Sequence, residues 1–314
     1  MTVDEPSPGA DRTRVGSDRT RVGSDRTRVE RVDDRLGLAV GRVGLSGRTL
    51  TTYARDHVSV RTPSRSDFRD GNTIDLLAPP APSDLPRWID RFHDTIGIMG
   101  AAHVQVRWEE PLAIDAPAVP PSADPALEAA CAQLGFGLVP TTILLLDELS
   151  EPAPTSAELA PVEAPSAVPG GAVDRRWHAA TVLYRYARGD TPDDWRDVDQ
   201  AFTDWAVDVQ RELASAGRCQ VWVAMRHGGP VGRLTLLHDR QGLAVVEDVI
   251  VHPVHRRIGI ASALTHRAVS SYLGVVPGAR VGVGADPGSR ADRLYRRLGF
   301  RPHATVWTAL RPPR

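Results

Sequence analysis

The stretch Val249-Ile250-Val251-His252-Pro253-Val254-His255-Arg256-Arg257-Ile258-Gly259-Ile260-Ala261 leads from an apolar strand into an Arg-x-x-Gly-x-Ala turn that opens a helix. Gly259 removes the side chain that would keep a ligand away from the backbone, and the small Ala261 leaves the first helical N–H groups accessible. Such N–H groups, together with the positive end of the helix dipole, bind phosphate without a lysine. The stretch therefore predicts a turn that binds a pyrophosphate.

A second motif, Leu294-Tyr295-Arg296-Arg297-Leu298-Gly299-Phe300, follows on a predicted helix. Together the two motifs resemble the GNAT superfamily of acyl-CoA-dependent N-acyltransferases. The resemblance implies an α+β (mixed α/β) fold, acetyl-CoA as co-substrate and an amine as acceptor. Because the triplet Leu-Gly-Phe ends both halves of the chain, at 134–136 and 298–300, we expect two GNAT-like domains, each a mostly antiparallel twisted sheet flanked by helices.

Composition excludes several other classes of protein. The 314 residues suit two domains, and 38 Lys and Arg against 39 Asp and Glu give a net charge of −1, so neither nucleic acid nor a membrane is expected as partner. The two distant cysteines, Cys131 and Cys219, favour a reducing compartment. We found no apolar run long enough for a signal peptide or membrane span, and expect a cytoplasmic monomer or homodimer.

The chain divides by composition into four parts. Residues 1–34 repeat an Asp-Arg-Thr-Arg-Val-Gly-Ser unit and are expected to be a disordered tail, because the unit offers no apolar seam for a coiled coil. Residues 35–150 form a first folded unit, which opens with strand-like alternation of apolar residues. Residues 151–170, rich in Pro and Ala, are predicted to be a linker. Residues 171–314 are the expected catalytic domain.

The second unit shows the element order of a GNAT fold after its first strand. Its apolar patterns predict a helix from Trp177 to about Arg188 and a second that carries Trp195 to Leu213. They also predict strands at 220–226, 231–239 and 243–252, a helix at 261–273, a strand at 281–285, a helix at 289–298 and a strand at 305–310.

The two halves end alike, with Leu134-Gly135-Phe136 in the first and Leu298-Gly299-Phe300 in the second. In that register Thr141 corresponds to Thr305, and Cys131 takes the place of Tyr295. No Arg-x-x-Gly-x-Gly/Ala turn exists between residues 101 and 125. We therefore expect tandem domains with a degenerate N-terminal copy; the alternative is that a triplet of common residues recurs by chance.

By resemblance, the backbone of Val249, Ile250 and Val251 would lie along the pantetheine arm, as if the ligand were another strand. The pyrophosphate would be held by a run of the turn and the following helix: Arg256, Arg257, Ile258, Gly259, Ile260, Ala261 and Ser262. The two arginines either add charge-assisted contacts or are merely solvated. Where many relatives carry an asparagine this chain has Gly288, and Ser289 is the candidate replacement.

The catalytic candidates are a tyrosine and two carboxylates. By resemblance, Tyr295 is the general acid that protonates the departing thiolate, although a tyrosine on such a helix can also be core packing. Presenting an alkylamine neutral at pH 7 costs roughly 4 kcal/mol, so a base is needed. Glu247 and Asp248 precede the strand segment beside the acyl group. Strand alternation predicts opposite faces for them, and Glu247 is favoured as the base; the alternative is that both are charges at the strand edge without a catalytic role.

The acceptor pocket would lie near the first two helices of the second unit. Aromatic and acidic residues there suit a cationic amine, although a buried stripe and a solvated helix face explain them better: Trp177, Tyr184, Tyr186, Trp195, Trp205, Asp190, Asp193, Asp194, Asp197 and Asp199. The substrate therefore stays open. His252, His255 and His303 lack the spacing of metal ligands, and no metal is expected.

The sequence predicts a cytoplasmic N-acetyltransferase that moves an acetyl group from acetyl-CoA to a primary amine by direct attack in a ternary complex. A small molecule is favoured over a protein as the acceptor. The alternatives are a non-catalytic acyl-CoA-binding or scaffold protein, and a protein or peptide N-acetyltransferase.

Overall fold

The computed structural model describes residues 35–119, 121–163, 172–185, 200–239 and 241–313. The tail predicted at 1–34 and the end of the predicted linker lie outside these ranges. Within them, no helix is long and apolar enough to cross a membrane.

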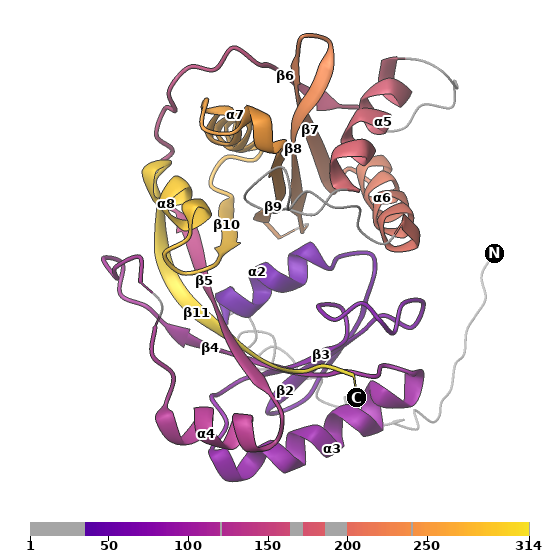
Figure 1. Cartoon of the computed structure of the whole chain (residues 1–314), viewed down its shortest axis with the longest axis vertical. Helices are drawn as coiled ribbons and strands as arrows, with labels where there is room; N and C mark the ends of the chain where they lie inside the picture. Colours follow the sequence, from indigo (N-terminus) through magenta and orange to yellow (C-terminus); the bar gives the residue numbers. More distant parts are fainter. Residues whose placement is uncertain (1–34, 120, 164–171, 186–199, 240, 314) are drawn as a thin grey trace, which may run out of the picture.

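The first half alternates short strands with helices along the sequence (Figure 1). In order its elements are α2 (Leu36–Gly44), β1 (Leu50–Tyr53), β2 (His57–Arg61), β3 (Thr73–Leu76), η1 (Pro82–Asp84), α3 (Leu85–Thr95), η2 (Gly97–Met99), β4 (Val104–Pro111), α4 (Pro125–Gln133) and β5 (Gly137–Leu146).

The second half has the order predicted for a GNAT fold. Its elements are β6 (Glu158–Val162), α5 (Ala172–Tyr184), α6 (Gln200–Ser215), β7 (Cys219–Arg226), β8 (Gly229–His238), β9 (Leu243–Val251), η4 (Pro253–His255), α7 (Ile260–Val275), β10 (Arg280–Ala285), α8 (Arg290–Arg297) and β11 (Phe300–Arg311). The α+β class with a mostly antiparallel sheet and flanking helices is confirmed.

Two local predictions were wrong. The stretch from Leu36, predicted as a strand, is helix α2, whose apolar residues are buried on several sides. A helix enclosed in this way loses the one-sided pattern that would identify it. The predicted linker contains strand β6, which pairs antiparallel with β7. Pro161 lies in this strand, which occupies the edge of the sheet, where proline is tolerated.

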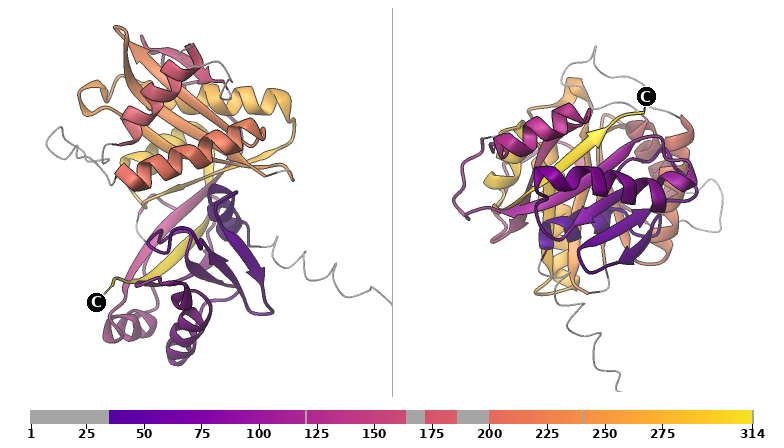
Figure 2. Two further views of the ribbon diagram at one scale, coloured as in Figure 1. Left: turned by 90° about the vertical axis from the view of Figure 1, so that its right-hand side faces the viewer. Right: turned by 90° about the horizontal axis from the view of Figure 1, so that it is seen from below.

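The two halves share one sheet because they exchange their last strands. The strand order is β1-β2-β3-β4-β11-β5-β10-β9-β8-β7-β6. Apart from the edge strand β6, the order from one side, β1-β2-β3-β4-β11, matches the order from the other side, β7-β8-β9-β10-β5. The last strand of each half thus lies beside strands of the other half. The left view of Figure 2 shows the upper and lower parts joined by these central strands. Each half has one parallel pair of strands, β3 with β4 and β9 with β10.

The doubled ending predicted from the sequence has the same backbone shape in both copies. Gly135 and Gly299 follow helices α4 and α8 with φ of 79° and 93°, a left-handed conformation that suits glycine. The register predicted beyond them is one residue wrong, because β11 has a bulge between Pro302 and Ala304. Thr141 therefore corresponds to Val306, and these two residues face each other across the exchanged strands.

A large side chain in the first half occupies the position that corresponds to a small one in the second half. Trp108 pairs with Trp307, whereas its counterpart Ala285 pairs with Thr142. Trp108 is 1% exposed and belongs to a buried cluster with aromatic residues of α3. The loop before α3, Ala78-Pro79-Pro80-Ala81-Pro82, contains three residues without an N–H group. Both features distinguish the first half from the second.

Candidate active site

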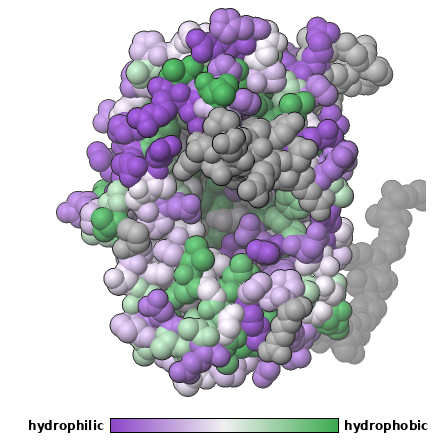
Figure 3. Space-filling model, in the orientation of Figure 1, coloured by the Kyte–Doolittle hydropathy of each residue, from purple (hydrophilic) through white to green (hydrophobic). Residues whose placement is uncertain are grey.

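A cavity of about 2060 Å³ opens where β9 and β10 separate. Their parallel pairing runs from Leu243 and Arg280 to Val246 and Val283, where it ends. The face drawn in Figure 3 is hollowed between the upper and lower parts of the molecule. All residues predicted to bind the cofactor or act in catalysis line this cavity except Ile258, which is 39% exposed.

The turn before α7 has the geometry predicted for phosphate binding. Gly259 is the N-cap of this 16-residue helix, with φ of 80°, and Arg257 has φ of 68°. The first helical hydrogen bond is donated by Ala263 N to Gly259 O, at 3.0 Å. Among the described residues no acceptor contacts the backbone N–H groups of residues 257–262. These groups and the positive end of the helix dipole therefore face the cavity with bonding capacity to spare.

The two arginines of the turn differ in their contacts. Arg256 Nε donates to Val251 O at 3.0 Å, so this side chain folds back onto the end of β9. Arg257 is exposed at the rim of the cavity. The carbonyl oxygens of Ala153 and Pro154 lie 3.5 Å from where a β-carbon on Gly259 would stand. The stretch before β6 thus borders the same turn.

Strand β9 bulges at the two carboxylates. Thr235 is opposite Glu247, Arg233 is opposite Ile250, and the register shifts between them. Asp248 has φ of 50°, which is uncommon for a residue other than glycine. The prediction that Glu247 and Asp248 point to opposite faces was wrong, because the bulge breaks the alternation. Asp248 bonds Thr235, the residue paired with Glu247, and both carboxylates line the cavity.

Asp248 belongs to a buried polar network. Its Oδ2 accepts from Gln210 Nε2 at 3.0 Å and from Thr235 Oγ1 at 3.4 Å, and it lies 3.8 Å from Arg233 Nη2. The side chain of Arg233 is 1% exposed and donates to Ala180 O, Gln210 Oε1 and Thr235 Oγ1. Asp248 thus compensates a buried charge and ties β9 to α6.

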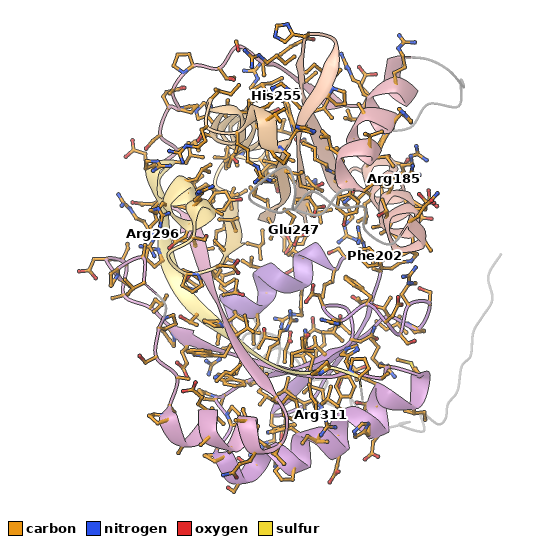
Figure 4. All side chains as sticks on the ribbon, in the orientation of Figure 1. Arg185, Phe202, Glu247, His255, Arg296 and Arg311 are labelled. Atoms are coloured by element: carbon orange, nitrogen blue, oxygen red, sulfur yellow. The ribbon has the colours of Figure 1, made fainter. Side chains whose placement is uncertain are left out.

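Glu247 contacts the other half of the chain. Its carboxylate lies against Gly44, at the end of α2, so closely that a β-carbon on Gly44 would overlap Oε1. Figure 4 shows Glu247 beside α2 in the middle of the molecule, with Phe202 of α6 to one side. The candidate base is therefore held partly by a helix of the first half.

Tyr295 lies on α8 and is 6% exposed, with its ring edge-on to Phe300 at 5.9 Å between centroids. Ser289 is the N-cap of the same helix, and its Oγ accepts from Asp292 N at 3.1 Å. The buried Asp292 also binds Arg296. Tyr295 thus sits on a well-fixed helix at the cavity wall, and Ser289 already has a structural role.

The histidines show no metal-binding arrangement. Burial, followed by the charges of His255 and Arg256, lowers the pKa of His252, and burial lowers the pKa of His303. Neutral imidazoles are therefore favoured at neutral pH. Among the described residues no three His, Cys, Asp or Glu side chains cluster as ligands would.

The aromatic residues proposed for the acceptor fall into separate places. Trp177 is 1% exposed in the core, and its Nε1 donates to Glu163 O. Tyr184 lines the cavity with the guanidinium of Arg233 4.5 Å from its ring centroid. Trp205 has the guanidinium of Arg48 at 5.2 Å. The candidates that lie outside the described residues are Tyr186, Asp190, Asp193, Asp194, Trp195, Asp197 and Asp199.

The first half contributes a wall of the cavity that was not predicted from the sequence. It comprises Gly37, Gly41 and Gly44 on α2, together with Arg48, Phe68, Asp70 and Arg107. Phe68 packs on Phe202 and Trp205 with ring centroids 5.6 and 5.3 Å apart, which joins the two halves at this wall. The glycine spacing was a usable signal, because positions four and then three residues apart share one face of a helix.

Comparison with known proteins agrees with this fold. Residues 217–302 match the family described as "Acetyltransferase (GNAT) domain". The structure is similar to a functionally unknown conserved protein from Staphylococcus epidermidis, with a TM-score of 0.59, 13% identity, and 86% of this chain and 96% of that chain covered.

Two further solved structures carry the family name. A GCN5-related N-acetyltransferase from Kribbella flavida gives a TM-score of 0.53 at 16% identity and covers 90% of this chain and 95% of its own. A second GCN5-related N-acetyltransferase, from Sphaerobacter thermophilus, gives a TM-score of 0.50 at 18% identity, with 86% of this chain and 84% of that chain covered. At these identities the likeness concerns the fold. No curated protein matches the sequence.

Proposed function

We propose that this chain, whose residues 217–302 match a GNAT acetyltransferase domain, transfers an acetyl group from acetyl-CoA directly to the primary amine of a small molecule. One observation carries the proposal: the N–H groups of residues 257–262 have no acceptor among the described residues and face a large cavity. A diphosphate supplies the charge and the acceptors that such a helix terminus binds.

The cavity also fits the rest of a nucleotide thioester. It continues from the turn along the separated edge of β9, where Val249, Ile250 and Val251 line the cavity and a ligand would lie as an added strand. Bound there, acetyl-CoA supplies an activated acyl carbon. The protein binds and orients it, and the separated strands shield it on both sides, which favours attack by an amine over attack by water.

Two side chains then handle the protons. Glu247, directly or through a water, takes a proton from the amine as nitrogen attacks the carbonyl carbon. Tyr295 gives its phenolic proton to the sulfur as the C–S bond breaks. The products are an N-acetyl amine and free coenzyme A. In this scheme Asp248 holds the bulge of β9, since its carboxylate is already engaged with Gln210 and Thr235.

The division of labour between the halves is part of the proposal. Residues 171–314 are the catalytic copy. Residues 35–150 are a degenerate copy that completes the wall of the site. The buried Trp108 and the proline-rich loop before α3 support this assignment. The cytoplasmic location and the monomeric or homodimeric state stay predictions.

The test is release of free thiol from acetyl-CoA with a panel of amines, polyamines, amino acids and lysine peptides. Burial raises the pKa of Cys219 to about 12 and that of Cys131 above its usual value, so the native protein contributes little thiol signal. Turnover with a small amine supports the proposal. Turnover only with peptides selects a peptide N-acetyltransferase, and tight acetyl-CoA binding without any turnover selects the non-catalytic alternative.

A further inference from the structure

Arg107 of β4 presents a guanidinium to the cavity from the first half. Its Nε donates to Asp75 Oδ1 at 2.8 Å, and its Nη1 lies 3.5 Å from where a β-carbon on Gly41 would stand. Its Nη2 is buried and has no hydrogen-bond partner in the described part of the chain. The side chain is 10% exposed. Nη2 is buried too deeply for a ligand to reach, whereas Nη1 is accessible and has no hydrogen-bond partner in the described part of the chain, so Nη1 can donate to a ligand in the cavity.

The surrounding charges leave room for an anion. Asp75, whose side chain is 0% exposed, is shared between Arg107 and Arg42, which binds its other oxygen at 2.9 Å. Burial works to lower the pKa of Arg107, but Asp75 and then Asp70 raise it above the usual value, so the guanidinium stays charged. Burial raises the pKa of Glu109, whose Oε2 accepts a hydrogen bond from Leu38 N at 2.8 Å. Asp70, exposed on the same wall, is the remaining acid near Arg107.

Helix α2 fixes the distance between this guanidinium and the proposed base. Gly41 lies beside Arg107 Nη1, and Gly44 lies beside the Glu247 carboxylate. Residues three apart are separated by about 4.5 Å along a helix and share a face. The absence of side chains at these glycines keeps that face open between the two charged groups. A small molecule with an amine and an anionic group a few bonds apart would span them.

The aromatic rings at this end of the cavity are already covered by cations. Arg48 lies over Trp205 and Arg65 lies over Phe202, at 5.2 and 5.5 Å from the ring centroids. A cage for a purely cationic acceptor would need those ring faces open. The positive surroundings instead favour an acceptor that brings a negative charge of its own.

We infer that the acceptor carries a carboxylate as well as its amine, and that Arg107 binds this carboxylate through Nη1. The inference rests on the proposed function, since it places the amine at Glu247. A hydrogen bond from a guanidinium to a carboxylate is charge-assisted and stronger than one between neutral groups. The substrate class is therefore an amino acid or a similar amino-carboxylic acid.

The experiment compares matched acceptors that differ only in this group. Thiol release from acetyl-CoA is measured with the standard amino acids, β-alanine and 4-aminobutyrate, each against its own carboxamide. We expect the wild-type protein to favour the best acid over its amide by about tenfold or more in kcat/KM, the usual size of a charge-assisted contact. The variant Arg107→Gln should lose that preference mainly through KM.

Arg42→Gln is the matched control, because it also removes a partner of Asp75 but does not line the cavity. It should keep the preference. If Arg107→Gln fails to fold, Arg107→Lys retains the charge beside Asp75 and should show a reduced preference. Turnover of amines with equal rates for acids and amides, or equal effects of the Arg42 and Arg107 variants, overturns the inference alone. No turnover of any amine overturns the proposed function itself.

Discussion

The carboxylate of Glu247 rests against the α-carbon of Gly44, so the candidate base of one half touches the end of a helix of the other. This contact requires a glycine. The residues are far apart in sequence and meet only because α2 crosses the centre of the shared sheet, between the two halves in Figure 1. A catalytic role for Glu247 therefore depends on the first half.

Replacing Gly44 by alanine should displace the Glu247 carboxylate. We expect kcat to fall by about tenfold or more, part of the contribution of a positioned base, with the affinity for acetyl-CoA unchanged. Gly274→Ala, on α7 with nothing within 4 Å of its new β-carbon, is the control and should leave kcat and stability near wild type. Normal kcat in a folded Gly44→Ala protein would remove Glu247 from the scheme.

Tyr295→Phe keeps the ring that packs on Phe300 and removes only the hydroxyl. If Tyr295 protonates the thiolate, kcat should drop by about 100-fold, within the usual range for general acid catalysis, while coenzyme A binding and thermal stability stay the same. Stopped thiol-release assays with wild type and variant at saturating acetyl-CoA make the comparison. Equal rates would show that this tyrosine is core packing.

Asp248→Asn tests the assignment of this carboxylate to the bulge. It weakens the compensation of the buried Arg233, so the free energy of unfolding should fall by about 1 to 3 kcal/mol. Urea titration measures the loss. Asp204→Asn is the control. It removes the acidic partner of Arg185 in an exposed ion pair, since the Asp204 side chain is 50% exposed, and should change the free energy of unfolding little. A fully stable Asp248→Asn protein with no turnover would instead make Asp248 the base.

His103 gives a prediction for pH. It is 2% exposed, and burial lowers its pKa below 6.5 despite the contact of its Nε2 with Asn72 O. As the pH falls through this range, the unfolded chain therefore binds more protons at His103 than the folded protein does. The contribution of His103 to stability is present above pH 6.5 and is lost as the pH falls towards the folded pKa. His103→Gln should reduce the loss of unfolding free energy between pH 7 and 5. The same slope in both proteins would contradict the assignment.

The sequence revealed the features that depend on neighbouring residues. The helices and strands of the second half follow apolar periodicity, and the turn at Gly259 was identified from its glycine and the helix after it. The Leu-Gly-Phe triplets at 134–136 and 298–300 identified the doubled ending, and both of their glycines have the left-handed conformation in the structure.

Features that depend on distant contacts were not predictable in this way. Nothing local to β5 indicates that it lies between β10 and β11, and the extra residue near His303 moved the predicted register by one. The alternation rule failed at Asp248 because a bulge sits there. Arg107 and the glycines of α2 became site residues only through the packing of α2 on both halves.

The central claim is that the N–H groups at the start of α7 bind the diphosphate of acetyl-CoA. The direct measurement is calorimetric titration of coenzyme A into wild type, Gly259→Ala and Gly259→Glu. Both variants bear the strain of φ at 80°, about 1 to 2 kcal/mol, but only glutamate adds a negative charge at the turn. The account predicts measurable binding to Gly259→Ala and none to a folded Gly259→Glu protein. Equal affinity in the glutamate variant and wild type would contradict it.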